Sequence, residues 1–403
     1  MIGLVLGCAS PGGDSAAPPP YPETYTPETD LEDYELVRVE TETWRPLEDP
    51  VETALYIQKA AYHRKSAPAE SLDHFAAMRE QLPPLGAGLR LTFAGDAMWV
   101  GGNWTHVFDA VADRFDGNLS ALNVETPTSP DLPTDQGALG LYAFNADPTY
   151  LDGLPVQAVQ LNNNHALDGG EEGLTASIAE VDARGLTRTG IDQHAVVDVA
   201  GKRVALLSFT WGINAQVTPQ RELFIVPFGH DGDVDLTPVF DAIAAVDADF
   251  VVVMPHWGYE YEYYPDPHFM VQARKLIAAG ADLIVGSGPH VVQPPELCHV
   301  NQGGTPGVGT CAIEADGPPR DAAVLYSLGN AATVMSTLPC QVGVVATVSL
   351  GEGGVTGLGW TPIVSHPDVP DVEPPDPGNA EEAAEIERLR THLGEGWERG
   401  GGE

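Results

Sequence analysis

Side chains of the kinds that bind metal ions follow several apolar, strand-like runs of this 403-residue chain. The run 161–168 (Leu-Asn-Asn-Asn-His-Ala-Leu-Asp) comes directly after one such segment, residues 156–161. Four other apolar runs end in comparable groups, which are Asp96, Asn123 with Glu125, His256 with Glu260, and His290. Ligands of open α/β sheets gather at the carboxyl ends of strands. The spacing therefore predicts one mixed site of carboxylates, amides and imidazoles.

This set of side chains indicates what chemistry the site can support. Mixed oxygen and imidazole ligands suit Mn²⁺, Fe²⁺ or Zn²⁺ better than Ca²⁺. An imidazole that contacts no metal can donate a proton to a leaving group. We therefore expect a site for divalent metal ions.

The elements that must position these groups alternate between strands and helices. The first predicted strands are residues 91–94, 119–124, 156–161, 204–209, 251–254 and 283–285, and later ones are 322–326, 343–350 and 355–361. The predicted helices are residues 105–114, 171–184, 236–246 and 268–279. Such alternation predicts a layered α/β fold.

Composition divides the chain into five segments. They are a possible lipoprotein signal remnant at residues 1–8, a disordered acidic and Pro-rich linker at 9–50, a helical extension at 51–86, the main domain at 87–365, and an acidic tail with a short helix at 366–403. The main domain is long enough to bury a large core. We expect the chemistry to lie there.

The N-terminal run Val5-Leu6-Gly7-Cys8 resembles a bacterial lipoprotein box, whose cysteine is lipidated. The segment before it is shorter than a signal peptide and lacks the positive start that such a peptide needs. Either the true start lies upstream or the match is accidental. We expect an exported protein of the cell envelope, anchored through Cys8 by acyl chains. No run approaches the roughly 20 apolar residues of a membrane-spanning helix.

The charge of the chain restricts its partners. Lys and Arg number 19 against 58 Asp and Glu, which gives a net charge of −39. This balance argues against nucleic acid and against anionic lipid as partners. It also repels a polyanionic substrate, so metal ions or local arginines must offset the field. If the protein is exported, two of Cys298, Cys311 and Cys340 can form a disulfide, but the sequence does not say which two. The alternative is that all three cysteines are unpaired.

Seven short motifs in order resemble the CapA family, named for its association with poly-γ-glutamate capsule synthesis and related to calcineurin-like metallophosphoesterases. The motifs are Gly95-Asp96, residues 123–125 and 142–148, Asn163-Asn164-His165 with Asp168, and residues 256–260, 288–290 and 326–330. The resemblance implies a two-layered β-sandwich flanked by helices. It also implies two metal ions at the strand ends, which together can activate a water molecule and stabilise charge on a phosphoryl group.

The same resemblance assigns roles to single residues. The implied metal ligands are Asp96, Glu125, Asn164, His256 and His290, and the implied catalytic residues are His165 and Asp96. Candidates for supporting or substrate contacts are Asn123, Asp168, Glu260 and Asn330. The chain departs from the wider superfamily at Met98, Glu125 and Gly288, where that pattern has His, Asp and His. One or two ligands are therefore missing by that template. Glu260 could substitute, and a site with one metal or none stays open.

The implied function is a metal-dependent hydrolase, foremost a phosphoesterase, linked to capsule or envelope polymer synthesis. Two alternatives stay open, namely a non-catalytic factor that binds envelope polymer, and a metal-dependent amide hydrolase acting on peptidoglycan or poly-γ-glutamate. The expected partners are an envelope polymer or phosphorylated substrate and other capsule-synthesis proteins. The chain has no Gly-x-Ser-x-Gly elbow and no Walker-type phosphate loop, which argues against a serine hydrolase and against ATP-driven ligation.

Overall fold

The computed structural model describes residues 67, 69–98, 105–133, 144–214, 219–226, 234–366 and 371–394. Its strands are β1 (Leu89–Ala97), β2 (Leu119–Val124), β3 (Ala158–Gln160), β4 (Thr187–Thr189), β5 (Ala195–Val199), β6 (Lys202–Thr210), β7 (Phe250–His256), β8 (Leu283–Val285), β9 (Glu296–Val300), β10 (Cys311–Ile313), β11 (Arg320–Leu325), β12 (Asn330–Ala332), β13 (Val342–Gly351), β14 (Gly354–His366) and β15 (Asp371–Glu373). Its helices are α2 (Ala69–Arg79), α3 (Gly170–Ala183), α4 (Thr237–Ala245), α5 (Pro267–Ala279), α6 (Leu338–Gln341) and α7 (Ala380–Leu393), with short 3₁₀ turns η2 (Ala112–Arg114) and η3 (Pro148–Gly153).

The strands form one hydrogen-bonded path with two parallel halves. The path runs β4-β3-β2-β1-β13-β14-β11-β8-β7-β6-β5. Strands β1 to β4 pair in parallel, and so do β6, β7, β8 and β11. The long antiparallel pair of β13 and β14 lies between these halves. Strands β14 and β11 pair only at Gly354 and Asp321, so the two halves are joined by a narrow connection.

The two halves pack against each other across a common apolar core. Phe93 of β1, Val252 of β7 and Ile284 of β8 belong to one buried cluster. At the far ends of the path, Thr189 Oγ1 of β4 donates a hydrogen bond of 2.6 Å to Leu206 O of β6. The path therefore folds back into two layers. This confirms the predicted α/β class, in which a large sheet is flanked by helices.

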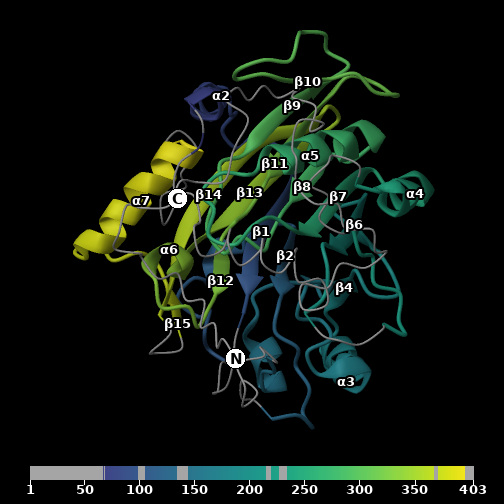
Figure 1. Ribbon diagram of the computed structural model, residues 1–403, viewed down its shortest axis with the longest axis vertical. Helices are drawn as coiled ribbons and strands as arrows, with labels where there is room; N and C mark the ends of the chain where they lie inside the picture. Colours follow the sequence, from purple (N-terminus) through teal and green to yellow (C-terminus); the bar gives the residue numbers. More distant parts are fainter. Residues whose placement is uncertain are drawn as a thin grey trace, which may run out of the picture.

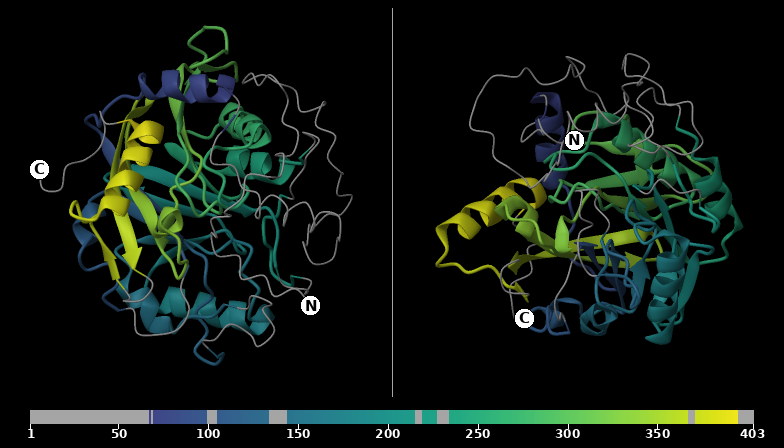
Figure 2. Two further views of the ribbon diagram at one scale, coloured as in Figure 1. Left: turned by 60° about the vertical axis from the view of Figure 1, so that its left-hand side comes forward. Right: turned by 60° about the horizontal axis from the view of Figure 1, so that its bottom comes forward.

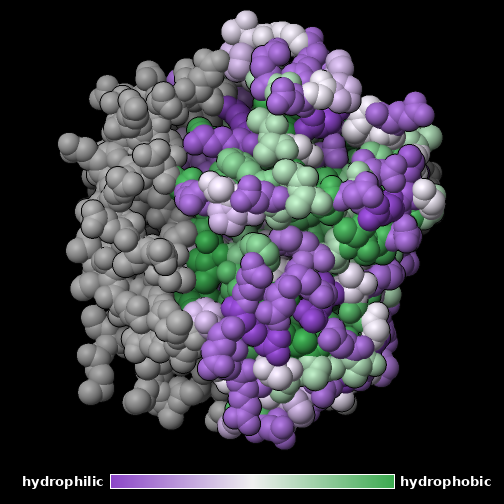
Figure 3. All heavy atoms as spheres, turned by 90° about the vertical axis from the view of Figure 1, so that its right-hand side faces the viewer, coloured by the Kyte–Doolittle hydropathy of each residue, from purple (hydrophilic) through white to green (hydrophobic). Residues whose placement is uncertain are grey.

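Helices cover the outer surfaces of the two layers. Figure 1 shows α4 and α5 on one flank of the sheet and α2 with α7 on the opposite flank. A second apolar cluster joins the other face of β2 and β3 to α3, through Leu122, Val159, Leu174 and Ile178. Hydrophilic side chains cover much of the face shown in Figure 3, in keeping with the acidic composition.

The predicted helices at 171–184, 236–246 and 268–279 are present as α3, α4 and α5, and the predicted tail helix is α7, capped by Asn379. The predicted helix at 105–114 is wrong, because only turns and the short η2 occur there. Backbone bonds in this segment join residues three apart, as in Val111 N to Phe108 O at 3.0 Å. Phe108 and Val111 are buried at that same spacing of three, which a 3₁₀-type turn serves as well as an α-helix.

The proposed lipoprotein box and the acidic linker lie outside the described residues, as does most of the predicted helical extension before α2. No helix among the described residues is long and apolar enough to cross a membrane. Cys298 and Cys311 lie opposite each other on β9 and β10 and form a disulfide, which selects one of the pairings that the sequence left open.

Candidate metal site

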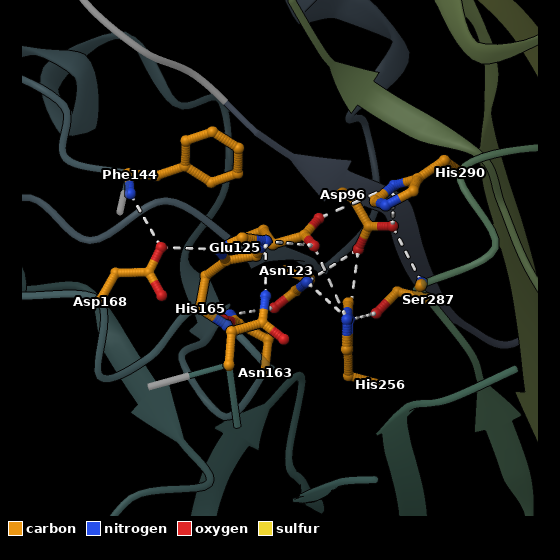
Figure 4. Close-up of polar contacts among 12 residues, drawn as sticks. Asp96, Asn123, Glu125, Phe144, Asn163, His165, Asp168, His256, Ser287 and His290 are labelled. Carbon is orange, nitrogen blue, oxygen red and sulfur yellow. Dashed lines mark hydrogen bonds and ion pairs between the residues drawn. The ribbon is translucent and has the colours of Figure 1, made fainter. Parts of the chain in front are cut away.

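Parallel strand ends bring the predicted residues together at one edge of the sheet. Asp96 lies near the end of β1, Glu125 directly follows β2, and His256 is the last residue of β7. Asn163 and its neighbours follow β3, and His290 follows β8. The strand register places Asp96 beside Asn123 on one side and Asn330 on the other. Figure 4 shows these side chains converging from both layers.

Asp96 is fully buried and held on both carboxylate oxygens. Asn123 Nδ2 donates to Oδ1 at 2.8 Å, and the backbone nitrogen of Gly288 donates to Oδ2 at 2.9 Å. Nδ1 of His290 lies 3.3 Å from Oδ2. The preceding residue must be glycine, because a Cβ atom at Gly95 would lie 1.8 Å from the carbonyl oxygen of Gly329.

Glu125 is also fully buried, but neither of its oxygens has a hydrogen-bond partner among the described residues. Oε1 lies 3.7 Å from His256 Nε2 and 4.0 Å from His165 Nε2, and Oε2 lies 3.8 Å from His290 Nδ1. Glu125, Asp96 and His290 each offer a ligand atom, and these atoms lie within 4.8 Å of one another. Buried charges in proteins are normally paired or bound to metals. The set therefore fits a divalent cation.

The charges in the site are strongly coupled. Burial and the charge of Asp96 raise the pKa of Glu125 to about 8. Burial alone would raise the pKa of Asp96, but the hydrogen bond and the positive charge of His290 are among the causes that lower it to about 2. Burial opposes the charge on His290, yet Glu125 and Asp96 outweigh it and raise the pKa of His290 to about 10. In the metal-free protein, His290 thus carries the positive charge that balances Asp96.

His256 differs from His290 in its protonation. Burial is the main cause that lowers the pKa of His256 to about 3, so its imidazole is neutral, the form that binds metals. Its Nδ1 lies 3.0 Å from the Ser287 hydroxyl and 3.3 Å from Asn123 Nδ2. These contacts fix the ring and leave Nε2 facing Glu125.

His165 lies on the opposite side of Glu125 and is oriented by Asp168. Nδ1 of His165 lies 2.6 Å from Asp168 Oδ2, which also accepts a 2.8 Å bond from the backbone nitrogen of Phe144. The Phe144 ring packs on the imidazole at 4.4 Å. Burial alone would lower the pKa of His165, but the Asp168 carboxylate raises it. The remaining nitrogen, Nε2, faces Glu125 and lies 3.4 Å from Asn214 Nδ2.

The other predicted residues fall into two groups. Asn330 supports His290, because its Oδ1 lies 3.0 Å from His290 Nδ1 while its amide donates to Cys340 O at 2.8 Å. Asn164 is buried with an unpartnered Oδ1, and no side-chain contact joins it directly to the carboxylates among the described residues. Glu260 is half-buried, and its charge acts on Glu125 and His290 without direct contact.

Several supporting residues were not singled out from the sequence. Ser287 contacts His256, Asn214 contacts His165, and Asn163 Nδ2 donates to Asn123 Oδ1 at 3.0 Å. Asn163 lies within a recognised motif and Ser287 directly precedes the motif at 288–290, which is a signal that could have found both residues. Asn214 follows a strand without any comparable signal. Met98, which the resemblance compared with a histidine of the wider superfamily, is buried.

A second cluster of potential ligands, Glu296 with Cys298 and Cys311, has a different explanation. The two sulfur atoms are joined in the disulfide. Glu296 is bonded to His74 at 2.5 Å, Arg274 at 2.6 Å and Tyr326 at 2.6 Å. Its carboxylate is therefore satisfied by protein groups, in contrast to Glu125.

The sequence profile of one family, described as bacterial capsule synthesis protein PGA_cap, matches residues 90–334 of this chain. The chain belongs to the PGA_cap family. The matched segment contains all of the candidate ligands, from Asp96 to His290, and also Asn330. Helices α2 and α7 lie outside it.

Curated relatives carry names of the same kind. The chain is 33% identical over 150 residues to the capsule biosynthesis protein CapA of Bacillus anthracis, covering 34% of this chain and 35% of the relative. It is 27% identical over 217 residues to the PGA biosynthesis protein CapA of Bacillus subtilis, covering 52% and 50%. The match thus spans half or less of the length of these relatives.

Among solved structures, a novel phosphatase from Mycoplasma pneumoniae aligns with a TM-score of 0.40 and 11% identity, covering 70% of this PGA_cap chain and 95% of the phosphatase. At this score the likeness between the two folds is partial, and the metal site is inferred only from contacts within this chain.

Proposed function

We propose that this PGA_cap protein is a metal-dependent hydrolase, foremost a phosphoesterase, that acts in the synthesis of an acidic capsule or envelope polymer of the poly-γ-glutamate type. The observation that carries the proposal is Glu125. This carboxylate is fully buried among Asp96, His256 and His290 and has no hydrogen-bond partner in the part of the chain that the structure describes, so a bound cation would stabilise it.

The residues present suit divalent Mn, Fe or Zn. The metal would be held by Asp96, Glu125, His256 and His290. Asn164 could add its side-chain oxygen Oδ1, which has no hydrogen-bond partner among the described residues. A second ion is part of this proposal. When bound, such ions supply an activated water and stabilise negative charge on a phosphoryl group.

Other side chains of the protein orient the metal ligands or donate a proton. Asn123 and the Gly288 backbone orient the Asp96 carboxylate, while Ser287 orients His256. His165, fixed by Asp168 at Nδ1, presents Nε2 on the far side of Glu125, where it can give a proton to a leaving group. The buried setting excludes bulk water from these contacts and strengthens them.

The test measures metal content and turnover in the full chain. Elemental mass spectrometry on wild type, Asp96→Ala and the exposed control Asp113→Ala should find Mn, Fe or Zn in the first and third proteins only. Hydrolysis of p-nitrophenyl phosphate and bis(p-nitrophenyl) phosphate should follow the same pattern and should also be lost in His165→Ala. A wild type without metal after reconstitution, or turnover retained in both Asp96→Ala and His165→Ala, overturns the proposal.

A second candidate is a non-catalytic role in polymer assembly, favoured by the buried Met98 at a position where the superfamily pattern has a ligand. Metal binding without turnover of any phosphoester supports this role. The amide-hydrolase alternative is tested by incubating the metal-loaded protein with poly-γ-glutamate or peptidoglycan and measuring the release of free amino groups. Attachment to the envelope through Cys8 is part of the proposal and is tested by labelling cells with a radioactive fatty acid.

A further inference from the structure

The loop that carries His290 is held by residues that are not themselves candidate metal ligands. Tyr261, Tyr263, Val291 and Cys340 form a small buried cluster of their own, next to His290 in the chain and in space. The Tyr261 ring lies 6.3 Å from the His290 ring, and its backbone nitrogen donates to Pro289 O at 2.8 Å. Tyr259, Tyr261 and Tyr263 are all buried, and their rings act as packing.

Two residues of this region have an unfavourable backbone conformation. Tyr261 has φ 67° and His290 has φ 59°, both in the left-handed region that L-residues with bulky side chains avoid. Such conformations are costly and persist only where the surroundings enforce them. Something must therefore hold these two loops in place.

Helix α7 supplies these contacts. The Arg388 guanidinium lies 4.3 Å above the Tyr263 ring, and its NH1 donates to Val292 O at 3.4 Å, two residues beyond His290. Nδ1 of His392 lies 3.2 Å from NH1 of Arg388, and the His392 ring packs on the Tyr264 ring with a centroid distance of 4.7 Å. Glu385 fixes Arg388 through a 2.7 Å bond to its Nε.

Helix α2 in turn contacts α7. Arg79 NH1 donates to the carbonyl oxygen of Thr391 at 2.6 Å. Both views of Figure 2 show the two helices side by side on one flank of the protein. The two helices lie outside the segment shared with the family, residues 90–334, so this support is a feature of the flanking sequence of this chain.

We propose that α7 is a positioning element of the metal site, in which Arg388 holds the loop that presents His290 to Asp96. The guanidinium acts through the Tyr263 ring and the Val292 carbonyl and touches no reacting group. The link to metal affinity rests on the proposed function, whereas the positioning of the loop does not.

The first measurement is hydrogen exchange of residues 286–292 in the metal-depleted full chain. Arg388→Met keeps the aliphatic stem and removes the guanidinium, and it should speed exchange of this loop about 10-fold while leaving β6 and β7 unchanged. The matched control is Arg390→Met, on the same helix, whose guanidinium pairs with the exposed Glu387 at 3.4 Å. Unchanged exchange in Arg388→Met, or an equal rise throughout the sheet, overturns the proposal.

The second measurement is the Mn²⁺ affinity of the same proteins by calorimetric titration. Arg388→Met should bind about 10-fold more weakly, the lower end of the effect of residues that orient metal ligands. In a His290→Ala background, the same substitution should have no further effect, because the ligand that it positions is gone. An equal loss in both backgrounds, or unchanged affinity in Arg388→Met, overturns the proposal while the metal site stands. If wild type binds no metal but exchange rises, the proposed function fails and the positioning role stands.

Discussion

Oδ2 of Asp96 lies 3.3 Å from Nδ1 of His290 and accepts a hydrogen bond from the backbone of Gly288, so one carboxylate joins β1 to the loop after β8. These residues belong to the two different layers of the sheet. The metal site is therefore also a contact between layers. A substitution that changes the charge of the metal site should therefore alter both the stability of the fold and the affinity for metal.

Glu125→Met should stabilise the metal-depleted protein while weakening metal binding. The carboxylate is buried without a hydrogen-bond partner, and such a group costs about 1–3 kcal/mol. Thermal unfolding of the metal-depleted variant should therefore occur at a higher temperature than in wild type, and added Mn²⁺ should raise it less. Glu296→Met is the matched control, because that buried carboxylate is fully bonded and its loss should destabilise. Destabilisation of equal size in both variants would contradict the interpretation of Glu125.

Glu296 should also give the protein a distinct dependence on pH. Burial alone would raise its pKa, but the Arg274 charge and the His74 hydrogen bond lower it to about 2, from an ordinary value of 4.5. A carboxyl group with a lowered folded-state pKa contributes stability above pH 4.5, and this contribution is lost as the pH falls toward 2. Urea denaturation between pH 3 and 7 should show Glu296→Gln about 3 kcal/mol less stable than wild type near pH 7. The difference should shrink steadily at acid pH, and a constant difference would contradict the assignment.

The net charge of −39 should make hydrolysis of phosphate monoesters sensitive to salt. A surface of one sign repels a dianionic substrate, and this repulsion is screened as the Debye length shortens from about 30 Å at 0.01 M salt to about 8 Å at 0.15 M. The KM for p-nitrophenyl phosphate should fall over this range while kcat changes little. A monoanionic phosphodiester should respond less. A KM that rises with salt would indicate a locally positive approach to the site.

The convergence of the candidate site residues was predictable because they follow a simple rule of α/β sheets. Asp96, Glu125, His256 and His290 each come at the end of a largely apolar strand or in the segment that follows it, and parallel pairing brings such ends together. The strands that carry these residues were found for a similar reason, since β2 and β8 are buried along their whole length and β8 is a run of Leu, Ile and Val.

The supporting contacts were not predictable, because they depend on packing between distant segments. Arg388 is one of several charged residues on an acidic helix, and nothing in its neighbourhood indicates that it lies over Tyr263. The sequence around Tyr263 likewise does not show that this ring is buried, with the Arg388 guanidinium against it. The disulfide pairing could not be predicted for a related reason, because only the register of β9 and β10 places Cys298 opposite Cys311.

Asp168→Asn should reduce hydrolysis while leaving metal content unchanged. Asp168 accepts from the Phe144 backbone and from His165 Nδ1 through the same oxygen, so it fixes both the ring and its tautomer. An asparagine can keep the backbone bond yet no longer favours a protonated His165. Turnover should fall about 100-fold, the usual contribution of a positioned general acid. The control is Asp147→Asn, an exposed carboxylate that caps η3 through Thr149 and should leave turnover unchanged. Loss of metal together with activity in Asp168→Asn would instead make Asp168 part of the metal-binding structure, and His165 would lose its assignment as the proton donor.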